Sequence, residues 1–170
     1  MSAELFRPIP TDRIGPDGIE VTVEATADEC AALAQRMQIP AVQSLTCRYR
    51  LKRSSADGIA ADGRLRARVV QTCVVSMDDF DSVVEEAFSV RFVPAGQEGD
   101  DIDPEGEDEI PYDDSVIDLG EATAEQLGLA LPAYPRRPGV ELPDQVELPD
   151  QAADEPANPF AALAERKSRN

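Results

Sequence analysis

The 170-residue chain contains no histidine and no tryptophan, and only 5 % of its residues are aromatic. Without histidine it cannot form Ser-His-Asp or Cys-His nucleophilic sites or histidine metal sites, and it lacks the most common general base. The glycine patterns of P-loops and dinucleotide-binding loops are also absent. We therefore expect a protein that is not an enzyme, with no catalytic residue, no small-molecule substrate and no cofactor.

Cysteines are few, and Cys30, Cys47 and Cys73 lie far apart in the sequence. An odd number of widely spaced cysteines predicts neither a disulfide framework nor a zinc site. We expect Cys47 and Cys73 to face the apolar side of their strands as small buried hydrophobes. There is no apolar run of 18 or more residues and no apolar signal-peptide region. These features predict a cytoplasmic protein that does not contact membranes.

Positive charge is scarce, since 16 basic residues stand against 34 acidic ones, for a formal net charge of −18. This excess repels phosphates, so any contact with nucleic acid requires a local basic patch. Residues 97–125 contain thirteen acidic residues and no Lys or Arg. Such a block predicts a flexible acidic insert at about 95–113, and its acidic residues do not follow the order of a calcium loop. We therefore expect no metal site.

The basic residues concentrate in residues 47–69, which hold seven of the 16. Alternation predicts two strands of a hairpin around a loop at 54–63. Both basic rows share one face only if residues of equal parity pair, for example Arg50 with Arg66, which requires an odd-length loop or a bulge. The predicted face carries Arg48, Arg50, Lys52, Arg64, Arg66 and Arg68.

This basic face has two interpretations. Its side chains repel one another across the strands, so some counter-charge is needed. Acidic residues elsewhere in the chain, including the acidic insert, supply it if the face is an ordinary solvated surface. Otherwise the face binds RNA or an acidic protein.

The remaining pattern predicts an α+β fold, with an antiparallel meander or small barrel-like sheet, two or three helices, and long acidic and Pro-rich flexible segments. Residues 1–17 are expected to run extended along the surface. Further elements are expected as strands at 19–24, 82–94 and 116–117, a helix between Thr26 and Pro40 with Glu29 at capping-box spacing, and a helix at about 119–131 that begins near Asp118 and Glu121, again at capping-box spacing.

Three regions are expected along the chain. Residues 1–135 form a single α+β domain, and 136–157 form a Pro-rich spacer in which "VELPDQ" occurs twice in tandem. Residues 158–170 form a short C-terminal helix and tail, with Phe160 and Leu163 as candidate partner-binding residues on one side.

From about residue 19 to 167 the chain resembles the YceD family, described as large ribosomal RNA subunit accumulation proteins. The resemblance depends most on "DLGEATAEQLGLALPAYP" and "NPFAALAERK", and includes "VVQTCVVSMDDFDSVVEEAFSVRFVP". It implies a cytoplasmic, non-enzymatic protein tied to accumulation or processing of large-subunit ribosomal RNA, whose gene commonly neighbours that of a large-subunit ribosomal protein. Many members have C-x-x-C where this chain has Cys73 and Ser76, so the second cysteine of that pair is missing here.

Our hypothesis is a ribosome biogenesis factor whose basic face contacts large-subunit ribosomal RNA or an acidic partner. The alternative is an acidic chaperone or adaptor for a basic ribosomal protein, without direct RNA contact. A magnesium-dependent nuclease is a third class, but its ligands would have to come from the acidic runs.

Overall fold

The computed structural model describes residues 4–54, 58–97 and 108–141. The chain divides into two units, residues 1–140 and 141–170, and every element described below lies in the first. This unit has an α+β fold, as predicted, with a five-stranded sheet, a two-stranded sheet and two α-helices. The Pro-rich spacer from residue 142 onwards and the predicted C-terminal helix lie outside the described residues.

The larger sheet has the strand order β2-β3-β4-β5-β6. The first four strands form the predicted antiparallel meander, and β6 joins parallel to β5. Residues 108–112, which fall within the predicted acidic insert, form β6, and residues 98–107 lie outside the described residues. The strands are β2 (Ile19–Glu24), β3 (Ala41–Arg53), β4 (Ile59–Thr72), β5 (Asp79–Pro94) and β6 (Asp108–Tyr112).

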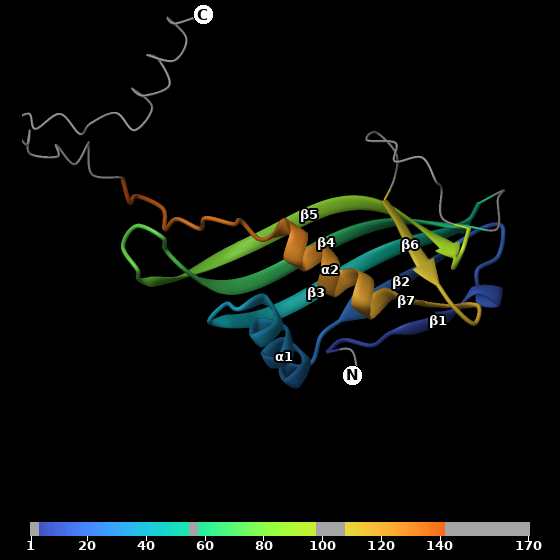
Figure 1. Cartoon of the computed structure of the whole chain (residues 1–170), viewed down its shortest axis with the longest axis horizontal. Helices are drawn as coiled ribbons and strands as arrows, with labels where there is room; N and C mark the ends of the chain where they lie inside the picture. Colours follow the sequence, from blue (N-terminus) through green and yellow to red (C-terminus); the bar gives the residue numbers. More distant parts are fainter. Residues whose placement is uncertain (1–3, 55–57, 98–107, 142–170) are drawn as a thin grey trace, which may run out of the picture. The chain divides into compact units, whose positions relative to one another are not determined.

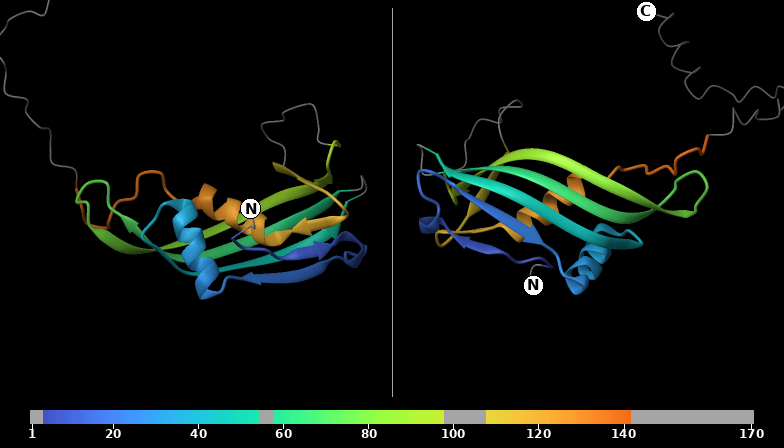
Figure 2. Two further views of the ribbon diagram at one scale, coloured as in Figure 1. Left: turned by 60° about the horizontal axis from the view of Figure 1, so that its bottom comes forward. Right: turned by 180° about the vertical axis from the view of Figure 1, so that it is seen from behind.

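The smaller sheet pairs β1 (Pro8–Pro10) with β7 (Val116–Asp118). It lies with helix α2 (Leu119–Ala130) against one face of the larger sheet, and α1 (Ala27–Met37) packs beside β3 (Figures 1 and 2). The predicted barrel-like closure is wrong, because these elements occupy the face that a barrel would turn inward. Among the described strands, β2 and β6 remain the two edges of an open sheet.

The N-terminal segment is part of the core. Leu5 and Ile14 are 0 % and 1 % exposed, so the prediction that residues 1–17 run along the surface is wrong at these two positions, while most of residues 4–17 are partly or fully exposed. After β1 a short 3-10 helix, η1 (Thr11–Arg13), turns the chain back toward β2. The apolar side chains of this Pro- and Gly-containing segment are isolated, so they form no periodic pattern from which their burial could be predicted.

The core lies between the inner face of the larger sheet and α2. Tyr49 on β3 is buried, and its hydroxyl lies 3.0 Å from that of Thr123 on α2. Because the Thr123 hydroxyl donates its hydrogen to the Leu119 carbonyl oxygen, Tyr49 is the donor of this bond. The ring of Phe88 occupies the space beside Gly63 and meets Tyr49 edge-on, with 5.7 Å between ring centroids. The aromatic side chains of the central strands therefore pack in the core, on the inner face of the sheet.

Both helices begin with a side-chain cap. Thr26 and Glu29 form the predicted capping box at the start of α1. At the start of α2, Asp118 accepts hydrogen bonds from the backbone N–H groups of Gly120 and Glu121. The Glu121 carboxylate does not complete a capping box but forms an ion pair with Arg36 of α1. The sequence thus predicted where both helices begin, but it did not predict the Arg36–Glu121 ion pair between them.

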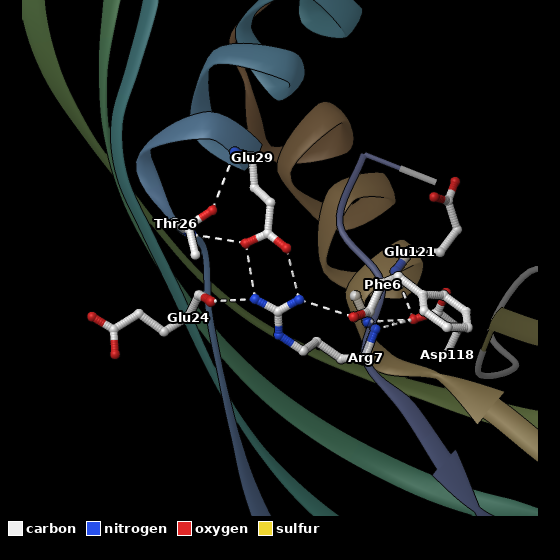
Figure 3. Close-up of polar contacts among 8 residues, drawn as sticks. Phe6, Arg7, Glu24, Thr26, Glu29, Asp118 and Glu121 are labelled. Carbon is white, nitrogen blue, oxygen red and sulfur yellow. Dashed lines mark hydrogen bonds and ion pairs between the residues drawn. The ribbon is translucent and has the colours of Figure 1, made fainter. Parts of the chain in front are cut away.

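Arg7 connects the N-terminal segment to both helix starts (Figure 3). Its guanidinium donates two hydrogen bonds of 2.8 Å to the two carboxylate oxygens of Glu29. Its backbone N–H donates to Asp118 Oδ1 at 2.8 Å. These bonds hold the N-terminal strand in place while satisfying the capping carboxylates of α1 and α2.

Replacing Glu29 with glutamine is expected to lower the free energy of unfolding by roughly 1–2 kcal/mol at neutral pH. Hydrogen bonds from Arg7, with a further one from the Thr26 backbone, lower the pKa of Glu29 to about 2. The folded pKa therefore lies below the unfolded one, so this stabilisation is present above about pH 4.5 and is lost as the pH falls toward 2. Urea denaturation at a series of pH values measures the difference.

The matched control is Glu24→Gln, because Glu24 is exposed and its carboxylate has no hydrogen bond or ion pair within the described part of the chain. This variant should unfold like the unaltered protein. A Glu29→Gln variant as stable as the unaltered protein at pH 7 would contradict the structural role of the Arg7–Glu29 pair.

Candidate functional site

The larger sheet has one face that no described helix or strand covers. We call it the outer face, and the right panel of Figure 2 shows it with β2 to β5 in front of α2. Along β3 and β4, buried and exposed side chains alternate over most of the strand length, so every second residue points to this face. All of the predicted basic residues lie there and are exposed, namely Arg48, Arg50, Lys52, Arg64, Arg66 and Arg68.

The pairing of β3 with β4 joins residues of equal parity, as predicted, and the connection of residues 54–58 has an odd length. The predicted partners were wrong, however, because Arg50 lies opposite Asp62 rather than Arg66. The reason is that β4 begins at Ile59, within the stretch expected to form the loop. Five residues that were assigned to the loop, 59–63, thus pair with β3.

This register changes the shape of the positive surface. Arg48 is directly opposite Arg64, and from this pair the two basic rows run in opposite directions along the sheet. The row on β3 continues through Arg50 to Lys52, and the row on β4 continues away from it. The result is a diagonal line that is one basic side chain wide except at the Arg48–Arg64 pair. We call it the basic stripe: Lys52, Arg50, Arg48, Arg64, Arg66 and Arg68.

Two members of the basic stripe have acidic partners on the neighbouring strands. Arg50 pairs with Glu20 of β2 at 2.9 Å, and Arg66 pairs with Glu85 of β5 at 3.3 Å. All four side chains are at least 64 % exposed. Ion pairs this exposed contribute about 0–1 kcal/mol each, so a ligand can displace them easily. Sequence reasoning missed these glutamates, although each lies at an outward-facing position of its strand.

The other four members have no ion pair with any described residue: Lys52, Arg48, Arg64 and Arg68. Like charges directly opposite each other destabilise a sheet, and Arg48 and Arg64 stand in that arrangement. Their neighbours on the outer strands, Thr22 and Ala87, carry no charge. Arg48 and Arg64 also line two adjoining open depressions of about 650 and 670 Å³. The middle of the stripe is therefore the place where a bound anion relieves most repulsion.

Three other predictions concern the C-terminal partner site, metal binding and membrane contact. Phe160 and Leu163 lie outside the described residues. Within residues 4–54, 58–97 and 108–141, no cluster of three or more His, Cys, Asp or Glu side chains is placed to hold a metal ion. No helix among the described residues is long and apolar enough to cross a membrane.

Cys47 and Cys73 are both buried, as predicted, but their surroundings differ. Cys47 lies in the core, where burial raises the pKa of its thiol to about 11. Cys73 lies in the turn after β4, where the Ser76 backbone N–H donates to its sulfur at 3.5 Å. Backbone N–H groups around this sulfur, that of Ser76 first, lower the pKa of Cys73 to about 6. Cys47 thus behaves as a small hydrophobe, while Cys73 favours the thiolate.

We expect one thiolate to appear near pH 6 in the folded protein, as an ultraviolet absorbance change, and to be absent from a Cys73→Ser variant. A Cys47→Ser variant, the matched control, should keep this transition because the pKa of Cys47 is raised. If the transition near pH 6 persists in Cys73→Ser, another group is responsible and the turn does not act on Cys73 as described.

Residues 61–166 match the family model described as large ribosomal RNA subunit accumulation protein YceD. The chain belongs to the YceD family. The match begins in β4 and includes β5, β6, β7, α2 and the β4 half of the basic stripe. The family's description ties this chain to the accumulation of large-subunit ribosomal RNA. Neither the curated proteins nor the solved structures include a match to this chain.

Proposed function

We propose that this YceD-family protein is a cytoplasmic ribosome biogenesis factor that binds large-subunit ribosomal RNA through its basic stripe and catalyses no reaction on it. One observation carries the proposal: Arg48 and Arg64 lie side by side on an open face, with no acidic partner in the described part of the chain. Arginine rows with uncompensated charge favour phosphate binding through charge-assisted hydrogen bonds. The family's description indicates which RNA this is.

The acidic character of the chain is compatible with this function because the charge is segregated. Residues 47–69 contain seven basic and two acidic residues, a net charge of +5, which leaves −23 on the rest of the chain. At physiological ionic strength exposed charges are screened beyond about 8 Å. Phosphates at the stripe therefore interact mainly with its own side chains. The surrounding negative charge disfavours binding in any other orientation.

A second candidate function is supported by the net charge of −18. An acidic protein can act as a chaperone or adaptor for a basic ribosomal protein, which would also support accumulation of the large subunit. In that case the stripe does not contact RNA. The two functions differ in what happens when the arginines of the stripe lose their charge.

The test is complementation of a strain that lacks the gene. Its ratio of large-subunit to small-subunit ribosomal RNA should fall, and the unaltered gene should restore it. A gene encoding Arg48→Gln, Arg64→Gln and Arg68→Gln together should not restore it, because the unpaired arginines are gone. Full restoration by this triple variant would contradict RNA binding through the stripe and favour the chaperone function.

The matched control variant carries Arg13→Gln, Arg136→Gln and Arg137→Gln. These three arginines are exposed and lie outside the larger sheet, so the variant loses the same charge away from the stripe. It should restore the ratio of ribosomal RNAs. Both variants are compared at equal protein levels, measured by immunoblotting.

A further inference from the structure

We propose that the basic stripe recognises double-helical RNA by following the phosphates of one strand, independently of base sequence, rather than binding unpaired RNA segments. This inference rests on the proposed function and goes beyond it by naming the form of RNA that is bound. Four features of the outer face support it.

The first feature is the linear shape of the stripe. Its ends, Lys52 and Arg68, face Ala60 and Ser44 on the partner strand, so they are eight residues apart along β4. At about 3.3 Å per residue the stripe is therefore ~26 Å long. Neighbouring members of one row are ~6.6 Å apart, since every second residue faces outward. This interval is similar to that between successive phosphates of a nucleic-acid strand, so a line of phosphates can meet a line of arginines.

The second feature is the lack of any aromatic side chain on the outer face of the described strands β2 to β5. Tyr49 and Phe92 are 2 % and 1 % exposed, and Phe88 packs over Gly63 on the inner face. Proteins that hold unpaired RNA normally stack its bases on aromatic rings, at about 1–3 kcal/mol per base. This face offers no such platform, so it can recognise the backbone but not splayed bases.

The third feature is a set of hydroxyl groups beside the arginines. Thr22 lies opposite Arg48, Thr46 opposite Arg66, and Ser44 opposite Arg68. Hydroxyl side chains commonly bond phosphate oxygens, and in RNA they can also reach the ribose 2′-hydroxyl. The stripe therefore combines the two kinds of group that bind an RNA backbone without reading its bases.

The fourth feature is the acidic border of the stripe. Glu20 and Glu24 of β2 lie on one side and Glu85 of β5 on the other. A flexible single strand would have to be held straight between these carboxylates using backbone contacts alone, which costs conformational entropy. A duplex holds the phosphates of each strand at a fixed spacing before binding, and it releases more counterions for each phosphate neutralised.

The experiment measures binding of the full chain to fluorescently labelled RNA by anisotropy. The probes are a perfectly paired RNA duplex of roughly 20 base pairs, a shuffled duplex of equal length, and a single strand without self-complementarity. Titrations are made at about 50 and 200 mM NaCl. We expect the two duplexes to bind equally, and at least about tenfold more tightly than the single strand.

The outcomes separate this inference from the proposed function. Tighter binding of the single strand would overturn recognition of duplex RNA and leave RNA binding by the protein intact. A strong preference between the two duplexes would overturn sequence independence. If no probe binds at either salt concentration, the inference and the proposed function both fail.

A substitution beside the stripe tests the path of the RNA without removing any arginine. Ala87 is exposed on β5 directly opposite Arg64, so Ala87→Glu places a carboxylate beside the middle of the stripe. This variant should fold at least as stably, because the new side chain can pair with Arg64, yet bind the duplex at least about tenfold more weakly. Unchanged duplex affinity in a folded Ala87→Glu protein would overturn the inference.

Discussion

Replacing Arg48, Arg64 and Arg68 together with glutamine is expected to weaken binding of RNA duplex by about 100-fold at low salt. These side chains are exposed and have no ion pair with any described residue, so their charge is available to phosphates. Glutamine keeps a polar, hydrogen-bonding side chain, though a shorter one, and removes the charge that releases counterions. Anisotropy titrations with the full-length protein measure the change.

The salt dependence of binding identifies the mechanism. Each lost phosphate contact should reduce the slope of log K against log [salt] by about 0.9, so the triple variant should lose roughly 2–3 units of slope. The control variant with Arg13, Arg136 and Arg137 changed to glutamine should keep the original slope. Equal slopes for the unaltered protein and the stripe variant would show that these arginines do not contact phosphates.

Unfolding does not provide an alternative explanation for this loss. The three arginines lie on the solvent side of the sheet, and Arg48 and Arg64 repel each other across adjacent strands. Their removal should leave the free energy of unfolding unchanged or slightly higher, as is common where binding residues are arranged at some expense of stability. Thermal denaturation of the variant checks this directly.

Changing Gly120 to alanine is expected to destabilise the protein by about 2–3 kcal/mol, although alanine normally favours a helix. A Cβ at this position would lie 2.7 Å from the carbonyl carbon of Leu5 and 2.9 Å from the backbone nitrogen of Arg7. The backbone there cannot move aside easily, because Leu5 is fully buried and Arg7 bonds Asp118 and Glu29. Chemical denaturation measures the loss.

Gly128 of the same helix provides the matched control. Its added Cβ would meet only the flexible side chain of Met37, with the sulfur 3.3 Å away. We therefore expect Gly128→Ala to stabilise the protein by about 0.5–1 kcal/mol through helix propensity. Opposite signs for the two substitutions would support the close approach of the N-terminal segment to α2. A stabilising effect of Gly120→Ala would contradict it.

Local patterns predicted the elements of the fold well. Alternation identified the strands that became β2 to β5, and the capping residues Thr26 and Asp118 identified the starts of both helices. The parity of the basic rows was also predictable, because a side chain's face depends only on its position along the strand. For the same reason, the sequence predicted that the six basic side chains share one face of the sheet, although it did not predict how they are arranged on that face.

Features that depend on pairing between segments distant in the sequence could not be predicted. The register that turns two basic rows into one stripe follows from where β4 begins. The sequence has turn signals at both Asp57-Gly58 and Asp62-Gly63, and nothing local shows that the second pair lies inside the strand. The counter-charges Glu20 and Glu85 become neighbours of the stripe only through strand order. The parallel addition of β6 likewise involves a partner that no local periodicity specifies.

The most direct test of RNA binding through the basic stripe is to follow the arginine Nε–Hε signals of the full-length protein by NMR while RNA duplex is added. The signals of the five arginines of the stripe should shift together and saturate, namely Arg48, Arg50, Arg64, Arg66 and Arg68. Those of Arg7 and Arg36, which are held in ion pairs with Glu29 and Glu121, should stay in place. Shifts confined to arginines outside the stripe, such as Arg166 and Arg169, would contradict the proposal that this face binds RNA.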